Sequence, residues 1–343
     1  MGRKPRERDA RGLLLFELRK RKQDGIYQHE FEVLSGFSKS HISETLSDME
    51  SEGRIIREVT SGPANRIWLP RYYPRYTEGS IRIGLLRSTE YSRAVLAINS
   101  YCRRKHIRAD FYMYDGVSAL LDDQCHGTIE ISMAPVVAQL MFAFTRNNIF
   151  LCDFIASSGS ALLANEKSVG NLLATTEPSS MLLLAREAPH GITEVVSYRY
   201  EDPCLAMKGF RKGKFRRLAI WEPYVTELKR TGDFAQILSY GELLGSLPCC
   251  SVAVSESFSS EGSTCVREIV EEIGRWRDRE LSDFDFSTAR KLIRTRCVSP
   301  ESFDESIGHY DFKVKFDRET LVAYLEKAKL PFTYEAIKER LLI

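Results

Sequence analysis

The chain has 343 residues, enough for two or three average domains. Hydrophobic residues make up 43% of it and charged residues 28%, which excludes a wholly disordered, collagen-like or low-complexity protein. The formal net charge is only +2, but residues 1–22 carry nine Lys or Arg against three acids. Such a basic segment favours contact with a polyanion, the alternative being a solubilising tail.

The sequence predicts a cytoplasmic protein without membrane association. No stretch reaches about 18 consecutive apolar residues, and the charged N-terminal segment lacks the apolar core of a signal peptide. The eight cysteines show no CxxC spacing. We therefore expect most of them to be small buried residues in a reducing compartment, and we predict neither a metal site nor a cofactor.

Apolar residues at helical spacing predict three helices in the first seventy residues, over 9–22, 28–34 and 38–52. Two short strand patterns follow, over 54–59 and 66–69, separated by a turn-rich tip. Helix, helix, turn, helix and a two-stranded wing is the order of a winged helix-turn-helix. Residues 1–70 resemble the DNA-binding domain of MarR-type regulators, which implies double-stranded DNA as a partner. The alternative is a protein-interaction module of the same shape.

The third helix has a polar face suited to a DNA groove. Ser38 is a good N-cap, and Gly53 is a plausible residue just beyond the C-terminus of the helix. Glu44 could accept a hydrogen bond from a cytosine amino group or simply be solvated. The predicted DNA-contacting residues are Ser38, Lys39, Ser40, Ser43, Glu44, Ser47, Asn65 and Arg66.

Residues 71–80 read as a linker, and strands alternate with helices from residue 81 to residue 144. This alternation predicts an α/β domain with a mostly parallel sheet covered on both faces. Ligands of such sheets bind at the carboxyl ends of the strands.

Several segments carry a specific resemblance. They are GTIEISMAP at 127–135, SSGSAL at 157–162, WEPY at 221–224, PCC at 248–250 and the closing region 312–332. Together they resemble the type 2 periplasmic-binding fold of nitrate-, sulfonate-, taurine- and pyrimidine-precursor-binding proteins. The resemblance implies two lobes within residues 81–343, the first formed by about 81–165 and 250–343 and the second by about 166–249.

The loops of this domain supply the candidate ligand contacts. Arg87, in a loop that opens a helix, could bind an anion such as a sulfonate or carboxylate, or instead form a surface ion pair. Trp221 could form an apolar wall or belong to the core. The predicted ligand-binding residues are Arg87, Ser88, Thr89, Ala134, Pro135, Ser157, Ser158, Ser160, Thr175, Thr176, Ser179, Trp221 and Tyr224.

These features together predict a ligand-responsive DNA-binding transcription regulator that acts as a homodimer and senses an anionic or heteroaromatic small molecule. No nucleophile elbow, P-loop, dinucleotide fingerprint or HExxH motif is present, so we expect no enzyme. Two alternatives stay open. One is an enzyme of the pyrimidine-precursor type with Cys249 and Cys250 as a metal or thiol site, and the other is a DNA-binding scaffold without a ligand.

Overall fold

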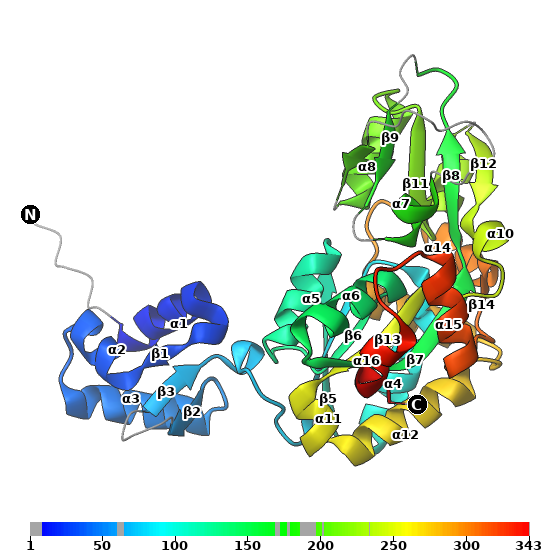
Figure 1. Ribbon diagram of the computed structural model, residues 1–343. Coiled ribbons are helices and arrows are strands. Elements are labelled where there is room, and N and C mark those ends of the chain that lie inside the picture. Colours follow the sequence, from blue (N-terminus) through cyan, green and yellow to red (C-terminus); the bar gives the residue numbers. More distant parts are fainter. Residues whose placement is uncertain are drawn as a thin grey trace, which may run out of the picture. The chain divides into compact units, whose positions relative to one another are not determined.

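The computed structural model describes residues 9–59, 65–168, 172–176, 179–185, 197–200, 202–232 and 234–342. The chain divides into two compact units (Figure 1). Unit 1 is Met1–Tyr76 with His126–Thr128, and unit 2 is Thr77–Cys125 with Ile129–Ile343. Among the described residues, no helix is long and apolar enough to cross a bilayer.

Unit 1 contains the predicted helices and strands, together with a further short strand that completes an antiparallel sheet of order β1-β3-β2. Its elements are α1 (Ala10–Arg21), η1 (Lys22–Asp24), β1 (Ile26–Tyr27), α2 (Gln28–Ser35), α3 (Lys39–Ser51), β2 (Ile56–Val59), β3 (Asn65–Trp68) and η2 (Pro70–Tyr72). The predicted tip at residues 60–64 and the basic residues 1–8 lie outside the described residues.

The boundaries of α3 follow from its caps. The Ser38 hydroxyl accepts a hydrogen bond from the backbone N–H of His41 at 3.3 Å, which confirms the predicted N-cap. Gly53 has a φ of +66°, the left-handed conformation expected just after a helix. The buried core of unit 1 consists of Leu14, Leu18, Ile26, Phe31, Ile42, Leu46, Met49, Ile55 and Ile67.

The first lobe of unit 2 is built on a six-stranded sheet of order β14-β7-β13-β6-β4-β5. Its strands are β4 (Ser80–Leu86), β5 (Arg108–Tyr114), β6 (Ile131–Pro135), β7 (Ile149–Ser158), β13 (Cys250–Ser255) and β14 (Tyr310–Asp311). Its helices are η3 (Thr89–Tyr91), α4 (Ser92–Arg104), α5 (Val117–Cys125), α6 (Val136–Arg146), α11 (Glu256–Glu261), α12 (Ser263–Trp276), α13 (Asp283–Ile293), α14 (Pro300–Ser306), η4 (Ile307–His309), α15 (Arg318–Lys327), α16 (Tyr334–Ile337) and η5 (Lys338–Arg340).

The second lobe is built on a five-stranded sheet of order β10-β9-β11-β8-β12 (Figure 1). Its elements are β8 (Ser160–Ala164), β9 (Leu173–Thr175), α7 (Ser180–Ala185), β10 (Ser197–Arg199), α8 (Pro203–Arg211), β11 (Arg217–Trp221), α9 (Tyr224–Thr231), β12 (Ala235–Ser239) and α10 (Tyr240–Leu244). Successive residues of its strands enter different cores: Leu163 and Leu218 pack in one cluster, and Leu162 and Ala219 pack in the other. Both faces of the sheet are therefore buried.

The sheets are mixed, which corrects the expectation of mostly parallel sheets. Strand β4 pairs in parallel with β5 and β6, but β13 is antiparallel to both β6 and β7. In the second sheet, β8 is antiparallel to β11 and β12. The cause is the path of the chain, which leaves the first lobe along β7, enters the second along β8 and returns into the middle of the first sheet as β13.

A local boundary also differs from the expectation. Strand β6 begins at Ile131, directly after Glu130, whose carboxylate accepts hydrogen bonds from the Arg82 backbone N–H at 2.6 Å and from the Arg82 guanidinium. The second lobe begins at Ser160 rather than at about residue 166, because β8 already belongs to its sheet.

The cysteines depart from the expectation in two respects. Six of the eight are free, but only Cys102, Cys152 and Cys250 are buried, whereas Cys125, Cys249 and Cys265 are half-buried. Cys204 and Cys297, however, form a disulfide. Cys204 lies in α8 of the second lobe, and Cys297 lies in the segment after α13 of the first. This pairing could not be predicted from the sequence, because its members are 93 positions apart.

Candidate functional site

A small cavity lies between the two lobes of unit 2, at the carboxyl ends of β4 and β6. Its volume is about 40 Å³, room for a small ion or a few water molecules. The first lobe lines it with Leu86, Ser88, Glu90, Tyr91, Val117, Pro135, Cys249 and Cys250. The second lobe lines it with Ser160, Thr176, Ser179, Ser180, Met181 and Trp221. Its position agrees with the general placement of ligands outside the carboxyl ends of parallel strands.

Six predicted ligand residues line this cavity. They are Ser88, Pro135, Ser160, Thr176, Ser179 and Trp221. Ser88 is held in place by its hydroxyl, which donates to the Glu222 carbonyl at 3.2 Å and lies 3.1 Å from the Tyr310 hydroxyl. The Trp221 indole N–H donates to the Arg87 carbonyl at 3.1 Å, and its ring stacks on Tyr200 at a centroid distance of 6.1 Å. The indole therefore forms a fixed wall joined to both lobes.

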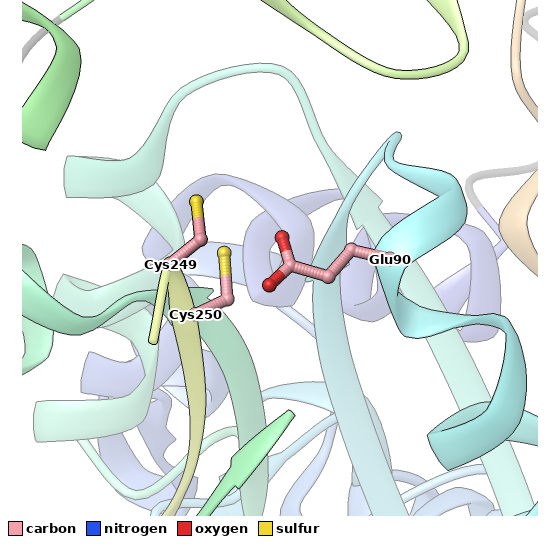
Figure 2. Close-up of side chains that lie close together, drawn as sticks. All are labelled: Glu90, Cys249 and Cys250. Atoms are coloured by element: carbon pink, nitrogen blue, oxygen red, sulfur yellow. The ribbon is translucent and has the colours of Figure 1, made fainter. Parts of the chain in front are cut away.

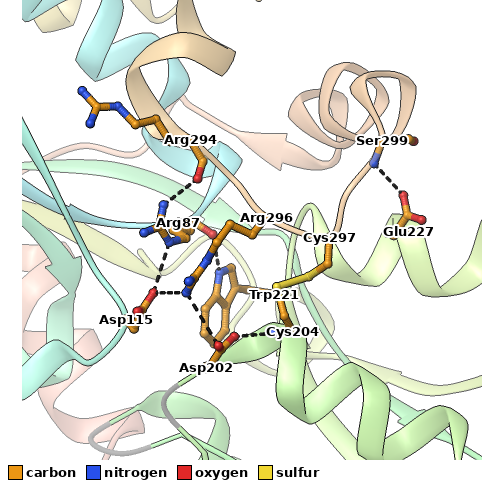
Figure 3. The surroundings of a disulfide bond; sticks show 10 residues. All are labelled: Arg87, Asp115, Asp202, Cys204, Trp221, Glu227, Arg294, Arg296, Cys297 and Ser299. Carbon is orange, nitrogen blue, oxygen red and sulfur yellow. Dashed lines mark hydrogen bonds and ion pairs between the residues drawn. A yellow bond between two sulfur atoms is a disulfide. The ribbon is translucent and has the colours of Figure 1, made fainter.

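Arg87 does not line the cavity and is instead bound to protein groups (Figure 3). Its Nε donates to the Asp115 carboxylate at 3.1 Å, and its Nη1 donates to the Arg294 carbonyl at 2.5 Å. Arg296 also binds Asp115, at 2.6 Å, and lies 3.6 Å from the Asp202 carboxylate of the second lobe. We call these five residues and the adjacent Cys204–Cys297 bridge the interlobe clasp.

The other predicted ligand residues are buried elsewhere or face a different cavity. Thr89 shares a hydrogen bond of 2.8 Å with Ser306, and Ala134 pairs with Ser251 inside the first sheet. Ser157 is buried in β7, and Ser158 faces the second cavity described below. Thr175 and Tyr224 are buried, and their hydroxyls have no hydrogen-bond partner among the described residues.

A second cavity of about 270 Å³, more open and polar, lies beside the turn between β7 and β8. Its walls are Ser158, Gly159, Ser160, Ala161, Glu222, Val225, Lys229, Gln236, Ser239 and His309. The Glu222 carboxylate accepts a hydrogen bond from His309 Nδ1 at 2.7 Å, and this bond raises the pKa of His309. Gly159 is required at this turn, since its φ is +74° and a Cβ there would lie 1.8 Å from the Tyr310 ring.

The sequence did not single out the acid of the first cavity, Glu90. It is 2% exposed, and its Oε1 has no hydrogen-bond partner in the described part of the chain. Burial raises the pKa of Glu90 to about 8, and the thiols of Cys250 and Cys249 offset only part of this effect. The sequence feature that could have indicated Glu90 is its place beside two hydroxyl residues, Ser88 and Thr89, in the turn after β4.

The predicted DNA-contacting residues of α3 all face solvent. They are Ser38, Lys39, Ser40, Ser43, Glu44 and Ser47, and each is exposed. The two residues on β3 are half-buried: Asn65 donates to Gln28 at 3.5 Å, and Arg66 donates from Nε to the Asp24 carbonyl at 2.7 Å. Arg66 also lies over the Tyr27 ring, with 5.0 Å between its Cζ and the ring centroid.

Comparison with solved structures defines the class of fold. The alkanesulfonate-binding protein SsuA of Xanthomonas axonopodis pv. citri, bound to MOPS, superposes with a TM-score of 0.61 at 14% identity, over 78% of this chain and 99% of that chain. The nitrate-binding protein NrtA of Synechocystis PCC 6803 superposes with a TM-score of 0.60 at 12% identity, over 77% of this chain and 86% of that chain. A Candida albicans gene product described as having the generic periplasmic binding protein fold superposes with a TM-score of 0.60 at 12% identity, over 76% of this chain and 94% of that chain.

The chain therefore contains a two-lobe, mixed α/β fold like that of periplasmic solute-binding proteins, as the sequence motifs predicted. No protein-family model matches the chain, and no curated protein matches its sequence. At these identities the similarity is one of fold.

Proposed function

We propose that the chain is a cytoplasmic, ligand-responsive transcription regulator in which unit 1 is a winged helix that binds double-stranded DNA and unit 2 senses a small molecule. The observation that carries the proposal is the exposed polar face of α3, within the order of helices and strands typical of DNA-binding winged helices. The solute-binding fold of unit 2 supplies the sensing part.

Ion pairs within unit 1 offset part of the negative charge of α3. Asp48 and Glu52, near its C-terminal end, share Arg11 at 3.1 and 2.8 Å. Lys39, at the N-terminal end, is exposed and free to contact a phosphate. Arg66 is bound to the Asp24 carbonyl and lies over the Tyr27 ring, so it does not provide a flexible phosphate contact.

The DNA proposal is tested with the full chain and a random-sequence duplex pool, followed by anisotropy measurements across a salt series. Lys39→Ala should weaken binding to all sequences and reduce the salt slope by about one, because it removes one phosphate contact. Ser43→Ala should instead change the preferred sequence. Lys208→Ala, an exposed lysine on α8 of unit 2, is the matched control. Binding that is absent, or independent of salt, would contradict the proposal.

We infer that the effector is an anionic or heteroaromatic small molecule that binds between the lobes. The structural relatives that bind an alkanesulfonate and nitrate support an anion, and the hydroxyls of Ser160 and Thr176 are suited to one. The Trp221 wall suits an aromatic ring. Measurements of the rise in unfolding temperature with nitrate, sulfonates and heteroaromatic acids test this inference. Trp221→Ala should abolish the rise, whereas the control Trp276→Phe in α12 should retain it.

DNA binding by unit 1 and ligand binding by unit 2 should be coupled if the protein acts as a regulator. A ligand that changes lobe geometry must change operator affinity, and DNA must change ligand affinity by the same factor. We propose a homodimer, because two winged helices on half-sites about one helical turn apart are sensitive to small domain rotations. We also propose that the ligand is bound and not converted. Recovery of the ligand unchanged after prolonged incubation would support binding alone, and turnover would favour the enzyme alternative.

A further inference from the structure

Three side chains with metal-binding atoms meet at one wall of the interlobe cavity (Figure 2). A carboxylate oxygen of Glu90 and the sulfurs of Cys249 and Cys250 all lie within 4.8 Å of one another. The Tyr91 hydroxyl is 3.4 Å from the Cys250 sulfur and closes one side of the group. The described residues contain no other such group of three or more.

The backbone explains how two adjacent cysteines can face the same way. Successive side chains of a regular strand point to opposite faces. Here Cys249 precedes β13, and the register of β13 against β7 shifts between Cys250 and Ser251. The Cys249 N–H donates to the Ala156 carbonyl at 2.9 Å, and Cys250 is also paired with Ala156. The alternation is interrupted at this point, so both sulfurs lie on the same side of the strand, and the Glu90 carboxyl points toward them (Figure 2).

The Glu90 carboxyl is an independent indication of a missing partner. It is held in η3, where its backbone N–H donates to the Ser88 hydroxyl at 3.3 Å. The side chain is 2% exposed, and Oε1 has no hydrogen-bond partner among the described residues. Buried polar atoms are nearly always partnered, because leaving one unpaired costs free energy. A metal ion beside the two sulfurs would give this oxygen a partner, because the oxygen could then bind the ion.

The composition of the group selects the ion. Sulfur ligands favour thiophilic ions over Mg²⁺ or Ca²⁺, which prefer oxygen. Sulfur atoms around a tetrahedral zinc ion, at about 2.3 Å from it, are about 3.8 Å apart, so the three side chains need to approach by only about 1 Å. Three protein ligands leave a fourth position open toward the cavity.

We propose that Glu90, Cys249 and Cys250 form a binding site for a thiophilic divalent metal ion of the zinc type, with an open fourth position facing the interlobe cavity. Each cysteine binds as a thiolate and Glu90 binds as a carboxylate, and the protons that these groups carried are released to solvent when the ion enters. This inference does not depend on DNA binding by unit 1.

The test uses the purified full chain, reduced and freed of metal with a chelator, and titrated with Co²⁺ as a spectroscopic substitute and with Zn²⁺ in competition. We expect one ion per chain, sulfur-to-cobalt charge-transfer absorption, and displacement of Co²⁺ by Zn²⁺ but not by Mg²⁺. Cys249→Ser and Cys250→Ser should each remove about half of the charge-transfer intensity. Glu90→Gln should keep that absorption but weaken affinity about tenfold or more.

Cys265→Ser, a half-buried free cysteine of α12, is the matched control and should bind as the unchanged chain does. Circular dichroism of each variant separates loss of the site from loss of the fold. Absent charge-transfer absorption in the folded chain would overturn the proposal. So would absorption that survives both cysteine substitutions, or a Cys249–Cys250 disulfide that reforms in place of metal uptake. DNA affinity measured in parallel on the same samples keeps a failure of this site distinct from a failure of unit 1.

Discussion

Breaking the Cys204–Cys297 bridge should lower the free energy of unfolding of unit 2. The bridge closes a loop across 93 positions, for which chain entropy gives an upper value of about 4.7 kcal/mol. Residual structure in the unfolded chain reduces this, so we expect a loss of about 2–4 kcal/mol for the double variant Cys204→Ser, Cys297→Ser. With an m-value of about 3 kcal/mol/M, the urea midpoint should fall by about 1 M.

Urea unfolding with and without a reductant provides the measurement. Cys297 is exposed, so the bridge is accessible to reduction. Reductant should lower the midpoint of the unchanged chain to that of the double variant and leave the double variant unaffected. Cys125→Ser, a change at a half-buried free cysteine, should retain the reductant effect. If reductant leaves the midpoint of the unchanged chain in place, the bridge does not form in solution and the reasoning is refuted.

Three further outcomes follow from local geometry. Gly159→Ala should destabilise unit 2 by at least about 1 kcal/mol in denaturant unfolding, because φ is positive and the Tyr310 ring occupies the Cβ position. Ser38→Ala should cost unit 1 about 1 kcal/mol, measured as a lower unfolding midpoint, through loss of the α3 cap. Burial raises the pKa of Asp153 from 3.8 to about 6 despite its Arg277 partner. The Asp153 carboxyl therefore contributes its full stabilisation below the pKa that it has in the unfolded chain, and this stabilisation is lost as pH rises through about 6. Between pH 4 and 7 the unchanged chain should lose up to about 3 kcal/mol of unfolding free energy that Asp153→Asn does not lose. Parallel curves of unfolding free energy against pH for the two proteins would contradict this.

Local patterns predicted local structure well. The α3 helix was predicted from the spacing of Ile42, Leu46 and Met49 together with its Ser38 cap, and the structure agrees because each signal acts within a few residues. The two-lobe fold was predicted from motif order and is confirmed by structural relatives. The mixed pairing of the sheets was not predicted, because strand direction depends on where the chain crosses between lobes rather than on the composition of any one strand.

The site was predicted only in part, for a physical reason. Ser88, Ser160 and Trp221, chosen for their loop positions, line the cavity, since those loops converge at the strand ends. Loop position could not show that Arg87 would meet Asp115, a partner 28 positions away that occupies its guanidinium. Nor could it bring Glu90 to cysteines about 160 positions further along the chain, because that contact depends on the return of β13 into the first sheet.

The size of the cavity and the interlobe clasp together constrain how a ligand binds. A volume of about 40 Å³ is far below the roughly 300–1,000 Å³ typical of pockets for drug-sized molecules. In this lobe arrangement the cavity therefore admits an ion or a small anion, whereas a heteroaromatic effector requires the lobes to separate. Separation must stretch the Arg296–Asp202 contact and the Trp221–Arg87 hydrogen bond, but the Cys204–Cys297 bridge limits how far it can go. A larger ligand should consequently bind faster to the reduced chain than to the oxidised chain, while a small ion should show no such difference.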